Sequence, residues 1–393
     1  MLKIRKFNSL VAAMLLGLSC WSYAQGLEPT KITVEEARID KAIKAMPDAA
    51  LRLTPRVELF AEQLSKATSY TMLTQLVIRH GKALWQDAKK SFRLLNDYDD
   101  RPLYWSRLQM SKALRTSAAF AKLYKHQQEK LLWTFELLSR GQSDVKFDKK
   151  ADKKILLTGF DPFFLDRNID QSNPSGVTAL SLDNIVVSIE GQTAEIEVLI
   201  VPVRFRDFDQ GMIEELLAPY IKRKAVDMVL TVSMGRENFD LERYPGLRRS
   251  AKAPDNLNVL TGASNTKPLV PMFNNAPLQG PEFVEFSLPT LAMKQGKGKY
   301  KVNDNHQVST LSAGTFNAQS LTELAEQTSV NGSGGGYLSN EVSYRSILLR
   351  NQYDLTLAVG HIHTPRIKAF DQDALVDIVN QTKNIITQGV AGL

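Results

Sequence analysis

From residue 154 onward, short apolar runs alternate with helical segments, and this alternation constrains the fold more than any other feature of the sequence. The apolar runs cover 154–159, 196–203, 228–232 and 355–359, and helical segments lie at 211–222 and 373–386. Strands that alternate with helices form a mainly parallel sheet with helices on both faces. The pattern therefore predicts a doubly wound α/β domain over residues 151–393.

The polar residues near the ends of these strands supply the parts of a nucleophilic hydrolase. In an open α/β sheet, functional side chains gather at the carboxyl ends of the strands. Ser339 stands at the expected N-terminus of a helix, while Glu242 and His363 come from other strand ends. A serine hydroxyl needs an adjacent base, and the base needs a third group that orients it and stabilises its charge. These residues predict a Ser-His-Glu triad, with backbone N–H groups at the helix start holding an oxyanion.

Each of these residues also has a structural alternative. Serine is among the best N-cap residues, so Ser339 is equally suited to capping its helix. Glu242 has Arg243 beside it for a surface ion pair. His361 and His363 lie two residues apart and share one face of a strand, a spacing that also suits a metal ion, although no further His or Cys is nearby.

Two segments depart from the α/β pattern. Residues 25–150 carry apolar side chains at helical spacing and few strand signals, which predicts an all-α N-terminal domain. Thr33 followed by Glu36 is the pattern of a capping box, which begins a helix. The segment 257–333 is rich in Asn, Gly, Ser, Thr and Pro, and its composition predicts a long insertion in the α/β domain, made of extended loops or of a small excursion from the sheet.

The first 24 residues predict an export signal. Three basic residues precede an apolar run over 10–21, and small residues end the segment at Ala24. This order is that of a cleavable secretory signal, so we expect a periplasmic or secreted protein that is cleaved near Ala24. The alternatives are a membrane anchor and a lipoprotein lipidated at Cys20. The apolar run is shorter than the ~20 residues of a spanning helix, and no later stretch is apolar enough to cross a membrane.

Cysteine content and charge exclude several kinds of site. The only cysteine is Cys20, inside the expected signal, so the mature chain would hold no disulfide, no thiolate metal site and no cysteine nucleophile. The formal net charge is +7. Removing the three basic residues of the signal leaves about +4 spread along the chain, which is not the basic patch of a nucleic-acid-binding protein.

Six groups of residues resemble the motifs of pyroglutamyl peptidase I and follow the same order as in that family. They are TGFDPF at 158–163 with NPS at 173–175, GR at 235–236 with DLER at 240–243, PDN at 254–256, GP and LP within 280–289, GYLSN at 336–340, and GHIHTP at 360–365. The resemblance covers most of the chain after residue 154. It implies the doubly wound α/β fold of that family.

The resemblance also implies an activity. The family removes N-terminal pyroglutamyl residues from peptides with a Cys-His-Glu triad, without a metal or another cofactor. His363 and Glu242 match the histidine and glutamate of that triad, and Ser339 stands where the family has its nucleophilic cysteine. By the same resemblance, Phe160 and Phe163 would flank the planar lactam ring, in an apolar slot suited to such a ligand.

Three further residues are expected to contact the substrate by resemblance: Asn173, Arg236 and Lys252. Lys252 replaces an arginine that is usual in the family. In the loop of the first motif, Phe164 and Leu165 replace a pair of glycines. The helical N-terminal domain has no counterpart in the typical enzyme.

These departures leave two functions open. A thiol can become a thiolate, whereas an alcohol needs His363 to take its proton during attack. The first hypothesis is an exported serine peptidase that acts on peptides with a blocked N-terminus. The alternative is a catalytically inactive protein that keeps the pocket for binding or scaffolding. In either case the helical domain is a candidate surface for a protein partner or a homo-oligomer.

Overall fold

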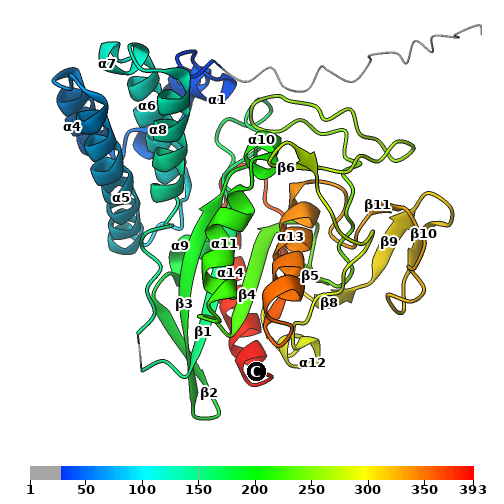
Figure 1. The fold of residues 1–393 in the computed structure, drawn as a ribbon. Coiled ribbons are helices and arrows are strands. Elements are labelled where there is room, and N and C mark those ends of the chain that lie inside the picture. The colour runs from blue at the N-terminus through cyan, green and yellow to red at the C-terminus, as the bar shows by residue number, and fades with distance from the viewer. Residues whose placement is uncertain (1–27, 149) are drawn as a thin grey trace, which may run out of the picture.

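The computed structural model describes residues 28–148 and 150–393. It places a helical region beside a larger α/β unit (Figure 1). The expected signal over residues 1–24, with its cleavage near Ala24, lies outside the described residues. Within the part of the chain that the structure describes, no helix is both long and apolar enough to cross a membrane.

The N-terminal region is helical, as its apolar spacing predicts. Its helices are α1 (Val34–Ala37), α2 (Ile39–Ala45), α3 (Pro47–Ala50), α4 (Thr54–Ser65), α5 (Tyr70–Leu95), α6 (Arg101–Thr116), α7 (Ala118–Ala121) and α8 (Lys125–Leu138). Thr33 and Glu36 form the expected capping box at the start of α1. Helices α4, α5 and α8 bury a common apolar core, in which the Phe60 and Phe135 rings stack 6.1 Å apart.

A seven-stranded sheet forms the centre of the α/β unit. In spatial order its strands are β2 (Ile185–Ile189), β3 (Gln192–Val201), β1 (Lys153–Phe160), β4 (Met228–Met234), β12 (Ala358–Thr364), β5 (Phe239–Glu242) and β8 (Val302–Asn305). The inner strands β3, β1, β4 and β12 are parallel, whereas β2 and β5 run antiparallel to their inner neighbours. The inner strands are largely apolar and buried, which is typical of parallel strands covered on both faces.

Helices cover both faces of the sheet, so the predicted doubly wound, mainly parallel α/β fold is confirmed. Helices α9 (Pro174–Leu182) and α14 (Gln372–Val390) pack on one face, and α11 (Met212–Lys222) and α13 (Leu338–Tyr353) pack on the other (Figure 1). The short α10 (Phe205–Asp209) follows β3, and α12 (Thr290–Met293) packs against α14. The carboxyl ends of β1 and β3 lead directly into residues that contact the helical region.

The segment 257–333 contains short strands as well as loops. It contains a hairpin of β6 (Met272–Phe273) and β7 (Ala276–Pro277), and a three-stranded sheet of β9 (Gln307–Thr310), β10 (Gly314–Asn317) and β11 (Ser329–Asn331). Its strand β8 joins the main sheet and places Asn305 opposite Glu242. The sequence of β8 is VNDN. Because its residues are polar, the sequence does not predict this strand. Pairing with β5, and not burial of apolar side chains, holds β8 in the sheet.

The last inner strand begins later than the apolar run at 355–359 predicts. The backbone N–H and the hydroxyl of Thr356 both donate to Asp354 Oδ1, which forms a turn before the strand. Strand β12 therefore starts at Ala358 and runs through Thr364, so that His361 and His363 lie within it.

Candidate active site

His363 and Glu242 form a buried, hydrogen-bonded pair. They come from the neighbouring antiparallel strands β12 and β5. His363 Nδ1 lies 2.6 Å from Glu242 Oε1, and both side chains are buried. Burial raises the pKa of the Glu242 carboxyl, and the neighbouring His363 partly offsets this rise. A carboxylate at Nδ1 fixes the tautomer of the ring and leaves Nε2 as the nitrogen that can accept a proton.

The turn after β4 leaves room for the His363 ring because it contains Gly235. A Cβ atom at this position would lie 2.6 Å from His363 Cβ and 2.9 Å from His363 Cγ, which is too close for any side chain. Gly235 N also donates to Thr364 O at 2.8 Å, which ties the turn to the end of β12. The glycine of the GR motif therefore positions the histidine of the GHIHTP motif.

Ser339 is the second residue of α13. The N-cap of this helix is Tyr337, so Ser339 does not have the capping role that its residue type also suits. Ser339 Oγ donates a 3.2 Å hydrogen bond to Gly334 O. A Cβ atom on Gly334 would lie 3.6 Å from His363 Cε1, so Gly334 is next to both side chains. Among the residues at 28–148 and 150–393, no hydrogen bond directly joins Ser339 to His363.

The start of α13 is fixed against a loop of the α/β unit. Asn340 Nδ2 donates to Gly246 O at 2.7 Å, and Asn340 Oδ1 accepts from Gly246 N at 2.9 Å. The first backbone N–H groups of a helix have no partner within the helix and carry a partial positive charge. The N–H groups at Leu338 and Ser339 are therefore suited to holding an oxyanion close to Ser339 Oγ.

Ser339 lines a small, mainly apolar cavity. The cavity has a volume of about 80 Å³, and its lining residues are Phe160, Phe163, Asn173, Val203, Ser233, Met234, Tyr337, Leu338 and Ser339. Three of the residues expected to contact substrate, Phe160, Phe163 and Asn173, thus meet the expected nucleophile. A small apolar space with a few polar groups suits a small, uncharged, planar ligand.

The side chain of Asn173 connects the segments that carry the cavity walls. As the N-cap of α9, it accepts a 3.1 Å hydrogen bond from Ser175 N at Oδ1. Its Nδ2 donates to Asp161 O at 2.9 Å, and Ser175 Oγ accepts from Phe160 N at 3.1 Å. The NPS motif therefore fixes the end of β1, and the Asn173 amide is engaged within the protein.

The loop after Phe163 has a conformation that favours glycine. Phe164 has a φ of 63°, in the left-handed region where most side chains are disfavoured. The resemblance of the first motif to pyroglutamyl peptidase I predicts a pair of glycines at this position. The Phe164 ring lies 4.2 Å from the Phe163 ring and is 40% exposed. Phe164 therefore adopts this turn and presents an aromatic surface next to the cavity residue Phe163.

Arg236 and Lys252 do not line the cavity. Both residues are exposed, and neither belongs to the cavity lining. The backbone carbonyl of Arg236 accepts from Arg366 N at 2.7 Å, which places this residue in the turn after β4. The structure therefore does not bring Arg236 and Lys252 together with the expected substrate contacts Phe160, Phe163 and Asn173.

His361 has a structural environment. Its Nδ1 lies 2.8 Å from Thr231 Oγ1, and its Nε2 lies 2.7 Å from Ser233 Oγ. Burial lowers the pKa of His361 well below its usual value, so the ring is neutral. Both nitrogens are engaged by hydroxyls of β4, which leaves neither free for a metal. In the described part of the chain, no group of three or more His, Cys, Asp or Glu residues could hold a metal ion.

Asn305 is a residue of the site that the sequence does not indicate. Asn305 Nδ2 donates to Glu242 Oε2 at 2.8 Å and to Ser333 O at 3.0 Å. Gly334, the residue after Ser333, accepts the Ser339 hydrogen bond. Asn305 therefore links the carboxylate of the His-Glu pair to the turn that contacts the expected nucleophile.

Two family models match this sequence, one over each part of the chain. The PA0049 N-terminal domain matches residues 19–136, and the PA0049 C-terminal domain matches residues 154–282 and 300–368. The second match alone covers about half of the chain. The chain belongs to the PA0049 family. The PA0049 C-terminal match includes Glu242, Ser339 and His363, and it omits 283–299.

Individual relatives fall into two groups. The uncharacterized protein PA0049 of Pseudomonas aeruginosa is 28% identical, in an alignment 396 positions long that covers 78% of this chain and 72% of that protein. A mutant pyrrolidone carboxyl peptidase from Pyrococcus furiosus is 22% identical, with a TM-score of 0.41, and covers 61% of this chain and 99% of its own. Pyroglutamyl peptidase I from Bacillus amyloliquefaciens is 20% identical, with a TM-score of 0.39, and the match covers 61% of this chain and 95% of that protein.

Proposed function

We propose that this protein is a serine hydrolase that releases an N-terminal pyroglutamyl or related blocked residue from peptides. The observation that carries the proposal is the buried 2.6 Å hydrogen bond between His363 Nδ1 and Glu242 Oε1, close to a cavity that Ser339 lines. A binding pocket has no need of an acid that orients a histidine, whereas a hydroxyl nucleophile requires both. The order of the sequence motifs supports the pyroglutamyl group as substrate.

In the proposed reaction, Ser339 Oγ attacks the carbonyl carbon of the blocked residue while its proton passes to His363 Nε2. Glu242 stabilises the imidazolium that forms, and the N–H groups at the start of α13 stabilise the oxyanion. The C–N bond then breaks, and His363 gives its proton to the leaving amine. Water hydrolyses the resulting ester with His363 as base, which regenerates the Ser339 hydroxyl.

The attack requires a change of the Ser339 rotamer. Ser339 Oγ exchanges its hydrogen bond to Gly334 O for one to His363 Nε2. Side-chain rotation is fast compared with turnover. Catalytic hydrogen bonds commonly form fully only when substrate is bound.

A serine nucleophile is compatible with export, which we propose for this chain. A low-pKa thiolate is prone to oxidation and mixed disulfides in an oxidising compartment, and an alcohol is not. The proposed substrates are accordingly peptides with a blocked N-terminus outside the cytoplasm.

A second candidate function is ligand binding without turnover. The hydrogen bond from Ser339 Oγ to Gly334 O favours it, because this bond engages the hydroxyl with a backbone carbonyl and not with the base. In that case the cavity and its apolar walls would bind the same blocked residue, and the helical region would hold a partner.

A comparison of two serines on α13 tests the proposal. Purified protein is assayed on a chromogenic pyroglutamyl amide, with Ser339→Ala and Ser346→Ala as matched variants. Ser346 lies seven residues along the same helix, and its Oγ also donates to a backbone carbonyl, that of Ser343 at 2.8 Å. We expect Ser339→Ala to lower kcat by about 10³-fold or more and Ser346→Ala to leave it nearly unchanged. Equal activities of wild type and Ser339→Ala would exclude Ser339 as the nucleophile.

A further inference from the structure

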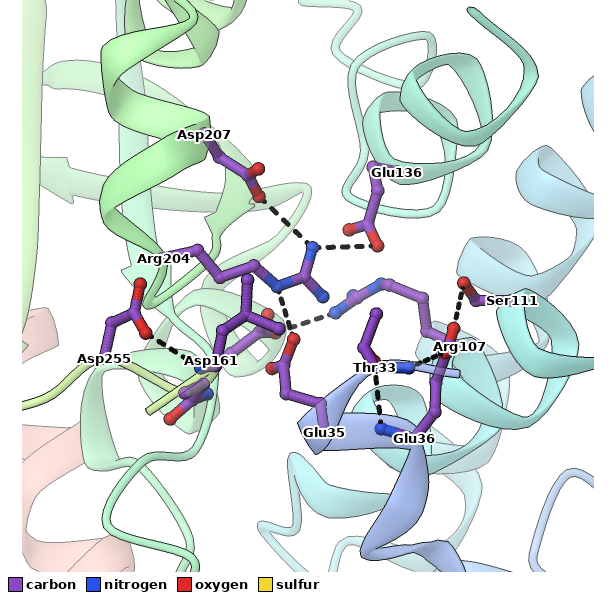
Figure 2. Close-up of polar contacts among 12 residues, drawn as sticks. Thr33, Glu35, Glu36, Arg107, Ser111, Glu136, Asp161, Arg204, Asp207 and Asp255 are labelled. Carbon is purple, nitrogen blue, oxygen red and sulfur yellow. Dashed lines mark hydrogen bonds and ion pairs between the residues drawn. The ribbon is translucent and has the colours of Figure 1, made fainter. Parts of the chain in front are cut away.

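The first wall of the cavity is the segment after β1 that carries Phe160 and Phe163. Two arginines of the helical region hold this segment in place. Arg107 Nη1 lies 2.8 Å from Asp161 Oδ1, and Arg140 Nη1 lies 2.7 Å from Asp161 Oδ2. Arg107 belongs to α6 and Arg140 follows α8, and all three side chains are at most 3% exposed. Asp161 directly follows the cavity residue Phe160 and precedes Phe163 by two positions. The Arg107 to Asp161 pair is drawn in Figure 2.

The second wall is the segment at the start of α9 that carries Asn173. An acid of the helical region holds it in place. Asp100 Oδ1 accepts from Ser172 Oγ at 2.6 Å, and Asp100 Oδ2 accepts from Asn173 N at 3.1 Å. Asn173 lines the cavity and donates to the backbone of Asp161. The first and second walls are therefore coupled to each other as well as to the helical region.

The third wall is the segment after β3 that carries Val203. Ion pairs with the helical region hold it in place. Val203 lines the cavity, and the next residue, Arg204, is buried among acids of the helical region. Arg204 Nε lies 2.5 Å from Glu35 Oε2, and Arg204 Nη1 lies 3.0 Å from Glu136 Oε1. Figure 2 shows the Arg204 guanidinium reaching between these two carboxylates.

We infer that the helical region is a structural part of the ligand site, with Arg107 and Arg140 as positioning residues for the walls of the cavity. The inference rests on the proposed function for the identity of the ligand. A buried ion pair adds little stability compared with apolar packing, but it fixes the relative position of the groups that it joins. Each of three cavity segments has a buried ion pair or a buried hydrogen bond to the helical region within one residue of a lining side chain. The helical region therefore sets the width of the cavity and with it the affinity for a small ring.

The test uses two buried cations of the helical region and the same substitution at each. Arg107→Met removes one of the two partners of Asp161 and leaves Arg140 in place. Lys89→Met is the matched control, because Lys89 is a buried cation of α5 that pairs with Asp183 at 2.5 Å, at the end of α9 and outside the cavity lining. Both changes are made in full-length protein that carries Ser339→Ala, so that no turnover occurs.

Two quantities are measured on each variant. Hydrogen exchange follows the backbone amides at 161–173, where Asp161 N donates to Val201 O and Ser172 N donates to Ala369 O. Calorimetry gives the Kd for L-pyroglutamamide. We expect Arg107→Met to speed exchange of this segment by about fivefold or more and to raise the Kd by about tenfold. Lys89→Met should change each quantity by less than about twofold.

The outcomes separate the inference from the proposed function. Unchanged exchange at 161–173 in Arg107→Met, or an equal change in Lys89→Met, would overturn the positioning role. Asp161→Asn provides a second variant from the α/β side, should Arg107→Met fail to fold, and the same two results are expected of it. If the Ser339→Ala parent does not bind L-pyroglutamamide while exchange responds as expected, the ligand assignment fails and the positioning of the loops stands.

Discussion

Asn305 donates a 2.8 Å hydrogen bond from Nδ2 to Glu242 Oε2, directly across the parallel pair of β8 and β5. The other carboxylate oxygen of Glu242 faces His363 Nδ1 at 2.6 Å. Both oxygens of the buried acid are thus in use, so the acid has one orientation. The polar segment around β8 therefore contributes to the geometry of the triad.

Replacing Asn305 should lower the rate of the chemical step. Asn305→Ala frees Glu242 Oε2 and the Ser333 carbonyl, so we expect kcat to fall about tenfold with little change in KM. Asn303→Ala is the matched control, because Asn303 Nδ2 donates to Asp240 Oδ1 at 2.9 Å two residues earlier on the same strands. Steady-state kinetics on a pyroglutamyl amide measure kcat and KM for both variants and for wild type. Equal losses in both variants would mean that Asn305 only supports the strand.

Removing the charge of Glu242 should impair catalysis without unfolding the protein. Glu242→Gln keeps the shape of the side chain but no longer stabilises the imidazolium, so we expect kcat to fall by about 10³-fold. The loss should be smaller than that of His363→Ala. Thermal melting checks that the variant is folded. A Glu242→Gln variant with nearly full activity would remove this residue from the mechanism.

A buried carboxyl far from the triad should make stability depend on pH. Burial and the neighbouring Asp183 carboxylate raise the pKa of Glu197 to about 8. Between the unfolded value near 4.5 and the folded value near 8, the folded state keeps a proton that the unfolded state has lost. This group therefore lowers the free energy of unfolding as pH rises, by up to about 1.4 kcal/mol per pH unit.

The amide variant isolates this effect. Glu197→Gln cannot ionise, so it should be more stable than wild type at pH 8, and the difference should shrink as pH falls toward 5. Urea unfolding of both proteins at several pH values measures the difference. A gap that stays constant with pH, or grows toward pH 5, would contradict the assignment.

The sequence was informative where local chemistry sets the structure. The inner strands are runs of apolar residues, which are buried in a parallel sheet and give a strong local signal. Glu242 and His363 were identifiable because each lies in a motif near a strand end. Strand β12 starts three residues after the apolar run at 355–359 begins, because the turn made by Asp354 and Thr356 precedes the strand.

Other features depend on contacts between distant residues and leave no local pattern. Asn305 lies in a polar segment whose composition predicts loops, and its role follows only from the register of β8 against β5. The pairing of Arg107 with Asp161 joins residues 54 positions apart, and a single buried arginine in an amphipathic helix has no distinctive spacing. The same holds for Arg204 and Glu35, which are 169 positions apart.

The most direct test of the account is to place a cysteine at the nucleophile position and measure turnover of a pyroglutamyl amide before and after thiol alkylation. In Ser339→Cys the new thiol would be the only cysteine after the expected signal, because the natural chain has only Cys20. We expect wild type to turn over the substrate and to resist iodoacetamide, whereas Ser339→Cys should turn it over at an equal or higher rate and be inactivated by the reagent. Absence of turnover in both proteins would contradict a peptidase function and favour the binding protein.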